Sequence, residues 1–271
     1  MNSFTIFLRG LFMGACDIVP GISGGTIAFI TGIYDRLLTA LGNLSNLEVK
    51  FLKKGDFDKF LKPLDLSFLL PLVFGIMVAV LSASRILLSL LQTYPSLVLS
   101  FFVGLILASG LALFSHVEQT SKTGLYVLVG LLLGALFSLL PTQAALASPS
   151  LFFVFIGGFL AITAMLLPGI SGSFLLLVLG LYLPTLEALH SFDTLYLVVF
   201  ALGAMMSLLF VSKGIKRLLE NRKNRTMAVL SGLVLGALLV PLRQITVSLP
   251  AIGLVLAGVG VSVLLTKFSK K

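Results

Sequence analysis

Charged side chains are scarce in this chain, and their scarcity excludes a soluble globular protein. Asp, Glu, Lys and Arg make up 11% of the 271 residues, whereas a typical soluble domain carries about 25%. Hydrophobic residues account for 58%, and the mean hydropathy is +1.14. A chain of this length and composition has room for roughly ten membrane crossings of about 20 residues each.

Cysteine and nucleotide-binding motifs are also lacking. Cys16 is the only cysteine, so neither an internal disulfide nor a metal site built on cysteines can form within the chain. No G-x-x-x-x-G-K-[ST] stretch is present, which argues against direct drive by ATP. We therefore expect no metal and no cofactor. The basic residues behind the net charge of +9 lie in short loops between apolar runs, a distribution that argues for a membrane protein and against nucleic-acid binding.

The apolar runs are of two kinds. Six look like ordinary spanning helices and lie at 67–91, 95–114, 124–140, 195–212, 226–242 and 249–266. The others form two pairs, 4–19 with 22–41 and 151–167 with 171–189, each joined only by a Pro-Gly break. Because the leading arms are short for a full span and each pair meets in a tight turn, we expect two re-entrant helical hairpins. Their irregular backbone must be buried in protein or line a wet cavity, so the hairpins belong at the centre of the molecule.

The sequence repeats itself. The stretch PGISG occupies positions 20–24 and again positions 168–172, an offset of 148 residues. Later matches, such as Gly75 with Gly203 and Gly130 with Gly258, follow at an offset of 128 residues. One insertion, the polar segment 43–65, accounts for the difference of about 20 residues between the two offsets. We therefore predict an internal duplication, with residues 1–140 as repeat 1 and 149–271 as repeat 2.

Lysine and arginine predict the orientation. They gather in 43–65, in 213–225 and at the C-terminus, and they are absent from 92–96, 141–150 and 187–194. If the basic segments are cytoplasmic, both termini lie in the cytoplasm and each repeat crosses the membrane an odd number of times, which inverts the second copy. The expected fold is an all-α integral membrane domain of two inverted-topology repeats, each with a re-entrant hairpin, 4–41 or 151–189, followed by three transmembrane helices. This architecture is typical of secondary transporters.

The two breaks predict an anion site. Proline ends one half-helix and glycine and serine start the next, which exposes backbone N–H groups at the positive end of a helix dipole. Phosphate is the natural ligand. Simple kinks in packed helices are the alternative. The candidate binding residues in the breaks are Pro20, Gly21, Ser23, Gly24, Gly25, Thr26, Pro168, Gly169, Ser171, Gly172 and Ser173.

Two repeat-related cations could accompany these breaks. Arg85 is expected near the outer face and Lys213 near the inner face, where they could receive a phosphate on entry and release it on exit. The alternative is that both side chains only snorkel to the interface.

Asp17 is an acidic residue inside an apolar run, three positions before Pro20. It lies near the C-terminal end of a half-helix, where the dipole disfavours negative charge by ~0.3–1 kcal/mol. Such a carboxylate is a candidate for binding a coupling proton or sodium ion, and an ion pair with Arg9 or Arg85 is the alternative. Arg36, by contrast, is expected to form a solvated pair with its neighbour Asp35.

At these residues the chain resembles the PopT family of polyprenyl-phosphate transporters. The resemblance rests on GACDIVPGISGGT at 14–26 with GIY at 32–34, and on LPGISGSF at 167–174 with GLY at 180–182. It spans essentially the whole chain. It implies a flippase that returns undecaprenyl phosphate, the lipid carrier of peptidoglycan synthesis, from the outer to the inner leaflet of the bacterial cytoplasmic membrane. The residues alone indicate a transporter with a central anion site and do not identify the lipid.

Two other functions stay open. An integral-membrane phosphatase acting on undecaprenyl pyrophosphate also has inverted re-entrant hairpins and a Pro-Gly-x-Ser motif. Its chemistry needs a basic residue directly after the serine and carboxylates nearby, whereas Ser23 and Ser171 are each followed by glycine. We therefore expect no enzyme. A small-anion carrier or channel would have a continuous polar pore closed to lipid.

Overall fold

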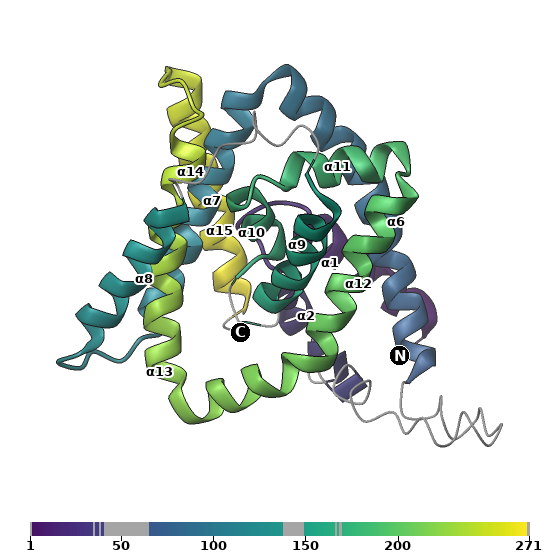
Figure 1. Cartoon of the computed structure of the whole chain (residues 1–271), viewed down its shortest axis with the longest axis horizontal. Helices are drawn as coiled ribbons and strands as arrows, with labels where there is room; N and C mark the ends of the chain where they lie inside the picture. The colour runs from purple at the N-terminus through teal and green to yellow at the C-terminus, as the bar shows by residue number, and fades with distance from the viewer. Residues whose placement is uncertain are drawn as a thin grey trace.

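The computed structural model describes residues 2–34, 36–37, 39–40, 65–137, 149–165, 167 and 170–269. These residues are almost all helical, and no strand occurs among them (Figure 1). The first half contains α1 (Ser3–Asp17), α2 (Gly24–Ile30), α6 (Leu66–Thr93), α7 (Pro95–Ser115) and α8 (Thr123–Phe137). The second half contains α9 (Leu151–Met165), α10 (Gly172–Val178), α11 (Tyr182–Ser191), α12 (Thr194–Phe210), α13 (Ser212–Ala237), α14 (Leu239–Leu242) and α15 (Leu249–Ser269).

Several helices are long and apolar enough to cross a membrane. Within the described ranges the full-length candidates are Leu66–Thr93, Pro95–Ser115 and Asn221–Leu242. The shorter apolar helices are Thr123–Leu136, Leu151–Met165, Thr194–Phe210 and Leu249–Leu265. Three of the six predicted spans therefore reach full length, and the other three are among the shorter helices. The all-helical membrane class is confirmed.

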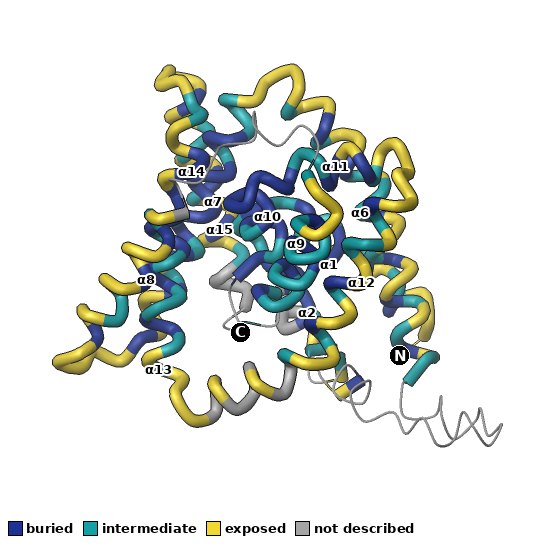
Figure 2. The backbone as a smooth tube through the Cα atoms, viewed as in Figure 1, coloured by how far each residue is buried: buried dark blue, intermediate teal, exposed yellow. Residues whose placement is uncertain are grey.

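The outer surface of the bundle is apolar, as a bilayer requires. Large hydrophobic side chains are exposed along the outer helices, for example Phe74 on α6, Leu132 on α8 and Leu256 on α15. Figure 2 shows many exposed positions along the outer helices. Such a surface would be unfavourable in water but is compatible with hydrocarbon, where there is no hydrophobic driving force to bury apolar side chains in the protein.

The trailing arms of the two predicted hairpins, 22–41 and 171–189, are not single helices, and that part of the prediction is wrong. α2 and α10 are each seven residues long and stop at a glycine in the left-handed region, Gly32 with φ 70° and Gly180 with φ 72°. In both places the next N–H bonds five residues back: Ile33 to the carbonyl of Ala28, and Leu181 to that of Leu176, each at 2.9 Å. This is the Schellman stop that glycine favours. In the second half α10 and α11 enclose a bend of 113°.

The helices pack in two matched sets. α1 packs against α6 as α9 packs against α12, and α7 packs against α15 as α13 packs against α8. Each partnership includes a glycine so close to a carbonyl oxygen of the other helix that a Cβ could not fit. The matched approaches are Gly75 to Phe7 and Gly203 to Phe155, Gly10 to Leu72 and Gly158 to Phe200, Gly104 to Val255 and Gly232 to Val127, and Gly130 to Val229 and Gly258 to Phe101. The offsets of 148 and 128 residues, which relate matched residues in the sequence, thus also relate the helix contacts that these residues make.

The core has two main parts. The larger cluster joins the first break to the second half, because Ile18 packs there with Phe102, Phe174 and Tyr182. A smaller cluster packs α1 and α2 on α6 and includes Met13. In Figure 1, α1, α2, α9 and α10 lie toward the middle of the view, and Figure 2 shows much of this region as buried.

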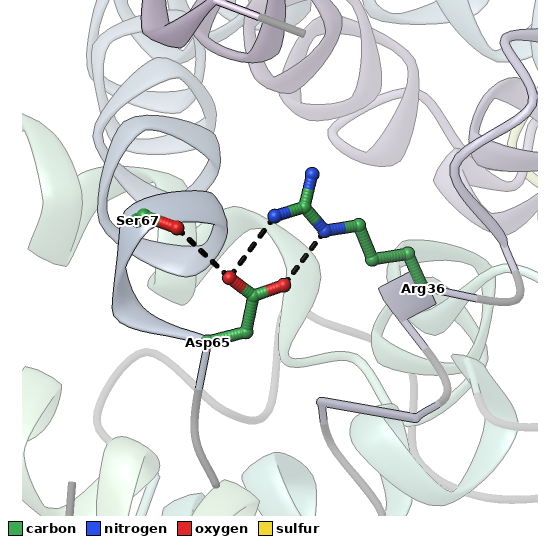
Figure 3. A network of polar contacts seen from close by, with 3 residues as sticks. All are labelled: Arg36, Asp65 and Ser67. Atoms are coloured by element: carbon green, nitrogen blue, oxygen red, sulfur yellow. Dashed lines mark hydrogen bonds and ion pairs between the residues drawn. The ribbon is translucent and has the colours of Figure 1, made fainter. Parts of the chain in front are cut away.

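A polar network joins Arg36, which follows α2, to the start of α6 (Figure 3). Arg36 donates two hydrogen bonds to the carboxylate of Asp65, at 2.7 and 3.0 Å, and Ser67 donates a third at 2.9 Å. The hydrogen bonds from Arg36 hold the pKa of Asp65 below its usual value, and Asp65 raises the pKa of Arg36. Arg36 thus bonds Asp65. Its predicted partner at position 35 lies outside the described residues, as do residues 43–64 of the insertion.

The basic segment 213–225, which the sequence suggests is a loop, is helical. It forms the first part of α13, which is interrupted at Arg222 by a non-helical backbone (φ −140°, ψ 33°). Lys, Arg, Leu and Glu all favour helices, so a basic stretch of this composition forms one readily. In Figure 1 this first part runs across the bottom of the view before α13 turns upward.

Candidate functional site

The first break separates α1 from α2 by the six residues 18–23. Pro20 and Ser23 are buried there, and Gly21 has a φ of 96°. This left-handed backbone suits only glycine, and a Cβ would also meet the backbone and side chain of Ile106 at 2.9 Å. The break is therefore a defined turn packed against α7 rather than a loose kink.

Asp17 links the two ends of this turn through a hydrogen bond. It is the last residue of α1, yet its carboxylate reaches the first residue of α2, where the N–H of Gly24 donates to Oδ1 at 2.6 Å. The carboxylate lies where a side chain on Gly24 would begin, so that only glycine fits. The sequence places Asp17 against the dipole of α1; the structure adds the favourable N-terminal end of α2.

The second carboxylate oxygen of Asp17 is buried and, within the described residues, has no hydrogen-bond partner. None of those residues forms an ion pair with Asp17, so the alternative of a structural pair with Arg9 or Arg85 is wrong for this conformation. A buried carboxylate oxygen with no donor is costly when the group is ionised. Asp17 is therefore poised to accept a proton or a cation on that oxygen.

Two side chains from other elements satisfy the carbonyl groups that the turn frees. Tyr182, at the start of α11, donates its hydroxyl hydrogen to the carbonyl of Ile18 at 2.5 Å. Ser109 of α7 donates to the carbonyl of Gly21 at 2.6 Å and lies 3.4 Å from the hydroxyl of Ser262. The sequence marks Tyr182 only as part of the GLY stretch at 180–182. It gives no reason to select Ser109, because serines in apolar helices usually bond their own backbone.

The second break is built with serines in place of a carboxylate. Ser171 caps α10 as predicted, because its hydroxyl accepts from the N–H of Phe174 at 3.5 Å. It also lies 2.7 Å from the hydroxyl of Ser173, and both side chains are buried. A Cβ on Gly172 would meet the carbonyl oxygen of Ala161 at 2.8 Å. Pro168 and Gly169 lie outside the described residues.

Of the four remaining candidates, Arg85 and Lys213 lie on α6 and α13, and Gly25 and Thr26 directly follow the first break in α2. Arg85 is exposed on α6 and makes no ion pair within the described part of the chain, while its neighbours Ser84 and Leu88 face the core. Gly25 is half-buried beside Ser23. The side chains of Thr26 and Lys213 are outside the description, and the described ranges contain no group of three or more His, Cys, Asp or Glu that could hold a metal ion.

The fold and the breaks define an integral membrane protein with discontinuous helices in its core. The comparisons with known proteins identify the family: a model described as undecaprenyl phosphate translocase-like matches residues 13–250, and the chain belongs to that family. It is 39% identical over 240 residues to a polyprenyl-phosphate transporter of Vibrio cholerae, which covers 88% of this chain and 77% of that protein. It is 30% identical over 248 residues to a polyprenyl-phosphate transporter of Staphylococcus aureus, covering 85% and 83%. No solved structure matches.

Proposed function

We propose that this protein moves undecaprenyl phosphate, a polyprenyl phosphate, between the leaflets of the bacterial cytoplasmic membrane and so recycles the lipid carrier of peptidoglycan synthesis. The observation that carries the proposal is the first break: a buried turn, closed by Asp17 and contacted by the second half of the chain. The names of the two relatives supply the substrate class. In this mechanism the phosphate enters the protein between the breaks while the isoprenoid tail stays in lipid.

The proposal includes two inverted-topology repeats with both termini in the cytoplasm. The matched glycine contacts and the matched stops at Gly32 and Gly180 support a duplicated structure. The lysine and arginine distribution supports the inversion. Two related halves around one site allow alternating access, in which movement of one half against the other exposes the site to each side of the membrane in turn.

The phosphate site we propose lies between the two breaks. Backbone N–H groups and the hydroxyls of Ser23, Ser171 and Ser173 are the donors that a phosphate would use there. Arg85 and Lys213 would attract the headgroup near opposite faces and would not hold it at the centre, which is consistent with the exposed position of Arg85. The other residues of the proposed site are Pro20, Gly21, Gly24, Gly25, Thr26, Pro168, Gly169 and Gly172.

Asp17 is the proposed coupling residue. Its ionised carboxylate already occupies the N–H of Gly24 and would repel a phosphate that enters the same turn. A proton on the unpartnered oxygen removes that repulsion, so proton binding and phosphate binding favour each other, as linkage requires. Sodium is the other candidate ion. Replacing sodium by potassium at a fixed pH gradient separates the two, and we expect no change in transport.

The function is tested with purified protein in proteoliposomes. We expect labelled undecaprenyl phosphate to exchange between leaflets at a rate that depends on the protein. Undecaprenyl pyrophosphate in the same vesicles should release no phosphate, and inorganic phosphate should not enter. Phosphate release without lipid exchange would contradict the proposal and favour a phosphatase, while uptake of inorganic phosphate alone would favour a small-anion carrier.

A further inference from the structure

The first break is held from outside the first hairpin at two of its carbonyl groups. Tyr182 binds the carbonyl of Ile18 and Ser109 binds that of Gly21. Tyr182 comes from the second half of the chain and is 3% exposed, and its ring packs edge-on against Phe102 with the centroids 6.1 Å apart. The hydroxyl hydrogen that Tyr182 donates to Ile18 is its only one, so Tyr182 cannot at the same time donate to a ligand.

These two bonds set the position of Asp17. Ile18 follows Asp17 directly, and Gly21 lies midway between Asp17 and its partner Gly24. The hydrogen bond that the N–H of Gly24 donates to Asp17 joins the two ends of the turn. It does not fix the turn relative to the rest of the protein. Tyr182 fixes the turn relative to α11, and Ser109 fixes it relative to α7. In a water-poor interior a carbonyl that loses its donor finds no replacement easily, so both bonds resist opening.

We propose that Tyr182 and Ser109 form a clamp that positions Asp17 for transport, with Tyr182 as the link between the two halves of the chain. Tyr182 is thus a positioning residue, not a substrate ligand. The inference rests on the proposed function, because the group that the clamp positions is the proposed coupling carboxylate. It goes beyond that function by naming the two side chains that hold the first break, Tyr182 of the second half and Ser109 of α7.

The chain contains a natural reporter for this clamp. Cys16 is the single cysteine, is half-buried and directly precedes Asp17. In the full-length protein in liposomes, its rate of alkylation by N-ethylmaleimide measures how often the end of α1 opens. The variant Tyr182→Phe keeps the ring and removes only the hydroxyl. We expect its alkylation rate to rise about tenfold, because loss of one buried hydrogen bond shifts a local opening equilibrium by about that factor.

Tyr196→Phe is the matched control. Tyr196 also uses a buried phenol in the second half, bonded to Thr185 at 2.7 Å, but it belongs to a separate hydrophobic cluster, with Val154 and Ala188. We expect its alkylation rate to equal that of the wild type. Ser109→Ala removes the other half of the clamp and should raise the rate as Tyr182→Phe does, which keeps the test decisive if Tyr182→Phe fails to fold. Wild-type rates in both clamp variants, or an equal rise in Tyr196→Phe, would overturn the inference.

Transport gives a separate readout. For labelled undecaprenyl phosphate we expect the clamp variants to raise KM several-fold while the maximum rate per folded molecule stays within about twofold, because a misplaced turn weakens capture of the headgroup. Tyr196→Phe should change neither value. If the wild type moves no undecaprenyl phosphate but the alkylation pattern holds, the proposed function fails while the positioning of Asp17 stands. If the wild type transports and neither KM nor alkylation responds, the clamp is wrong.

Discussion

The carboxylate of Asp17 joins two helices that the chain separates by six residues. It ends α1 and binds the first N–H of α2, and Gly24 leaves the space in which it lies. The favourable end of α2 offsets the unfavourable end of α1, which lets an acidic residue remain in this turn. This arrangement requires both the carboxylate of Asp17 and the absence of a side chain at Gly24.

Gly24→Ala tests that packing. A Cβ would overlap the carboxylate, so we expect the free energy of unfolding to fall by about 1–3 kcal/mol, the usual cost of overpacking, with loss of transport. Thermal unfolding in detergent measures the first effect. Gly253→Ala is the control, because Gly253 lies in α15 with nothing within 4 Å, and alanine there should be neutral or stabilising. Equal stability of Gly24→Ala and the wild type would contradict the observed position of Asp17.

The segment that follows α2 is attached to the start of α6 by the hydrogen bonds between Arg36 and Asp65. Both side chains are partly open to solvent, with exposed fractions of 41% and 34%, so water screens the pair. Arg36 lowers the pKa of Asp65. The stability from this pair is therefore fully present above the unfolded pKa of about 3.9 and is lost as the pH falls through the lower, folded value.

The pH dependence of Asp65→Asn checks this attachment. We expect the variant to be less stable than the wild type by at most ~1 kcal/mol near neutral pH, and the difference to vanish in strong acid. Denaturation curves between about pH 7 and pH 1 measure it, because the effect is lost only below the unfolded pKa of about 3.9. Arg36→Gln should give the same curve, since it removes the same pair. A difference that persists in acid would mean that Asp65 acts mainly through Ser67 or the start of α6.

Some elements could be predicted from the sequence, for identifiable reasons. The Pro-Gly pairs stop helices wherever they occur, so the break after α1 was predictable. The stops at Gly32 and Gly180 were not, because a glycine in an apolar run is as often a packing contact, like Gly75, as a helix end. The bond between Asp17 and Gly24 spans seven positions and depends on the shape of the turn, which no helical or strand periodicity reveals.

The molecule as a whole is held together by close helix pairs that occur twice. Without a strong hydrophobic drive between helices in lipid, close backbone approach at small residues contributes much of the packing. Gly104 brings α7 against α15, and Gly232 brings α13 against α8. The glycines that make these close contacts were predictable from their matched positions in the sequence. The pairs of helices that these glycines join were not predictable, because the sequence does not specify which helix a glycine contacts.

If the two halves are structurally equivalent, replacing equivalent glycines should lower the free energy of unfolding by similar amounts. Gly104→Ala and Gly232→Ala each place a Cβ on a facing carbonyl, and we expect each to lower the free energy of unfolding by about 1–3 kcal/mol. Thermal unfolding of both variants in the same detergent gives the comparison. Gly260→Ala is the control, because Gly260 in α15 has nothing within 4 Å. A large loss for one glycine and none for the other would contradict equivalent packing.

The central claim is that Asp17 couples phosphate-lipid movement to a proton, and an imposed pH gradient tests it most directly. Labelled undecaprenyl phosphate in proteoliposomes should accumulate in one leaflet when the wild type is given a gradient. Asp17→Asn keeps an oxygen to accept from Gly24 but cannot titrate, so it should exchange the lipid between leaflets without accumulation. A wild type that ignores the gradient, or an Asp17→Asn variant that accumulates lipid as the wild type does, would contradict the claim.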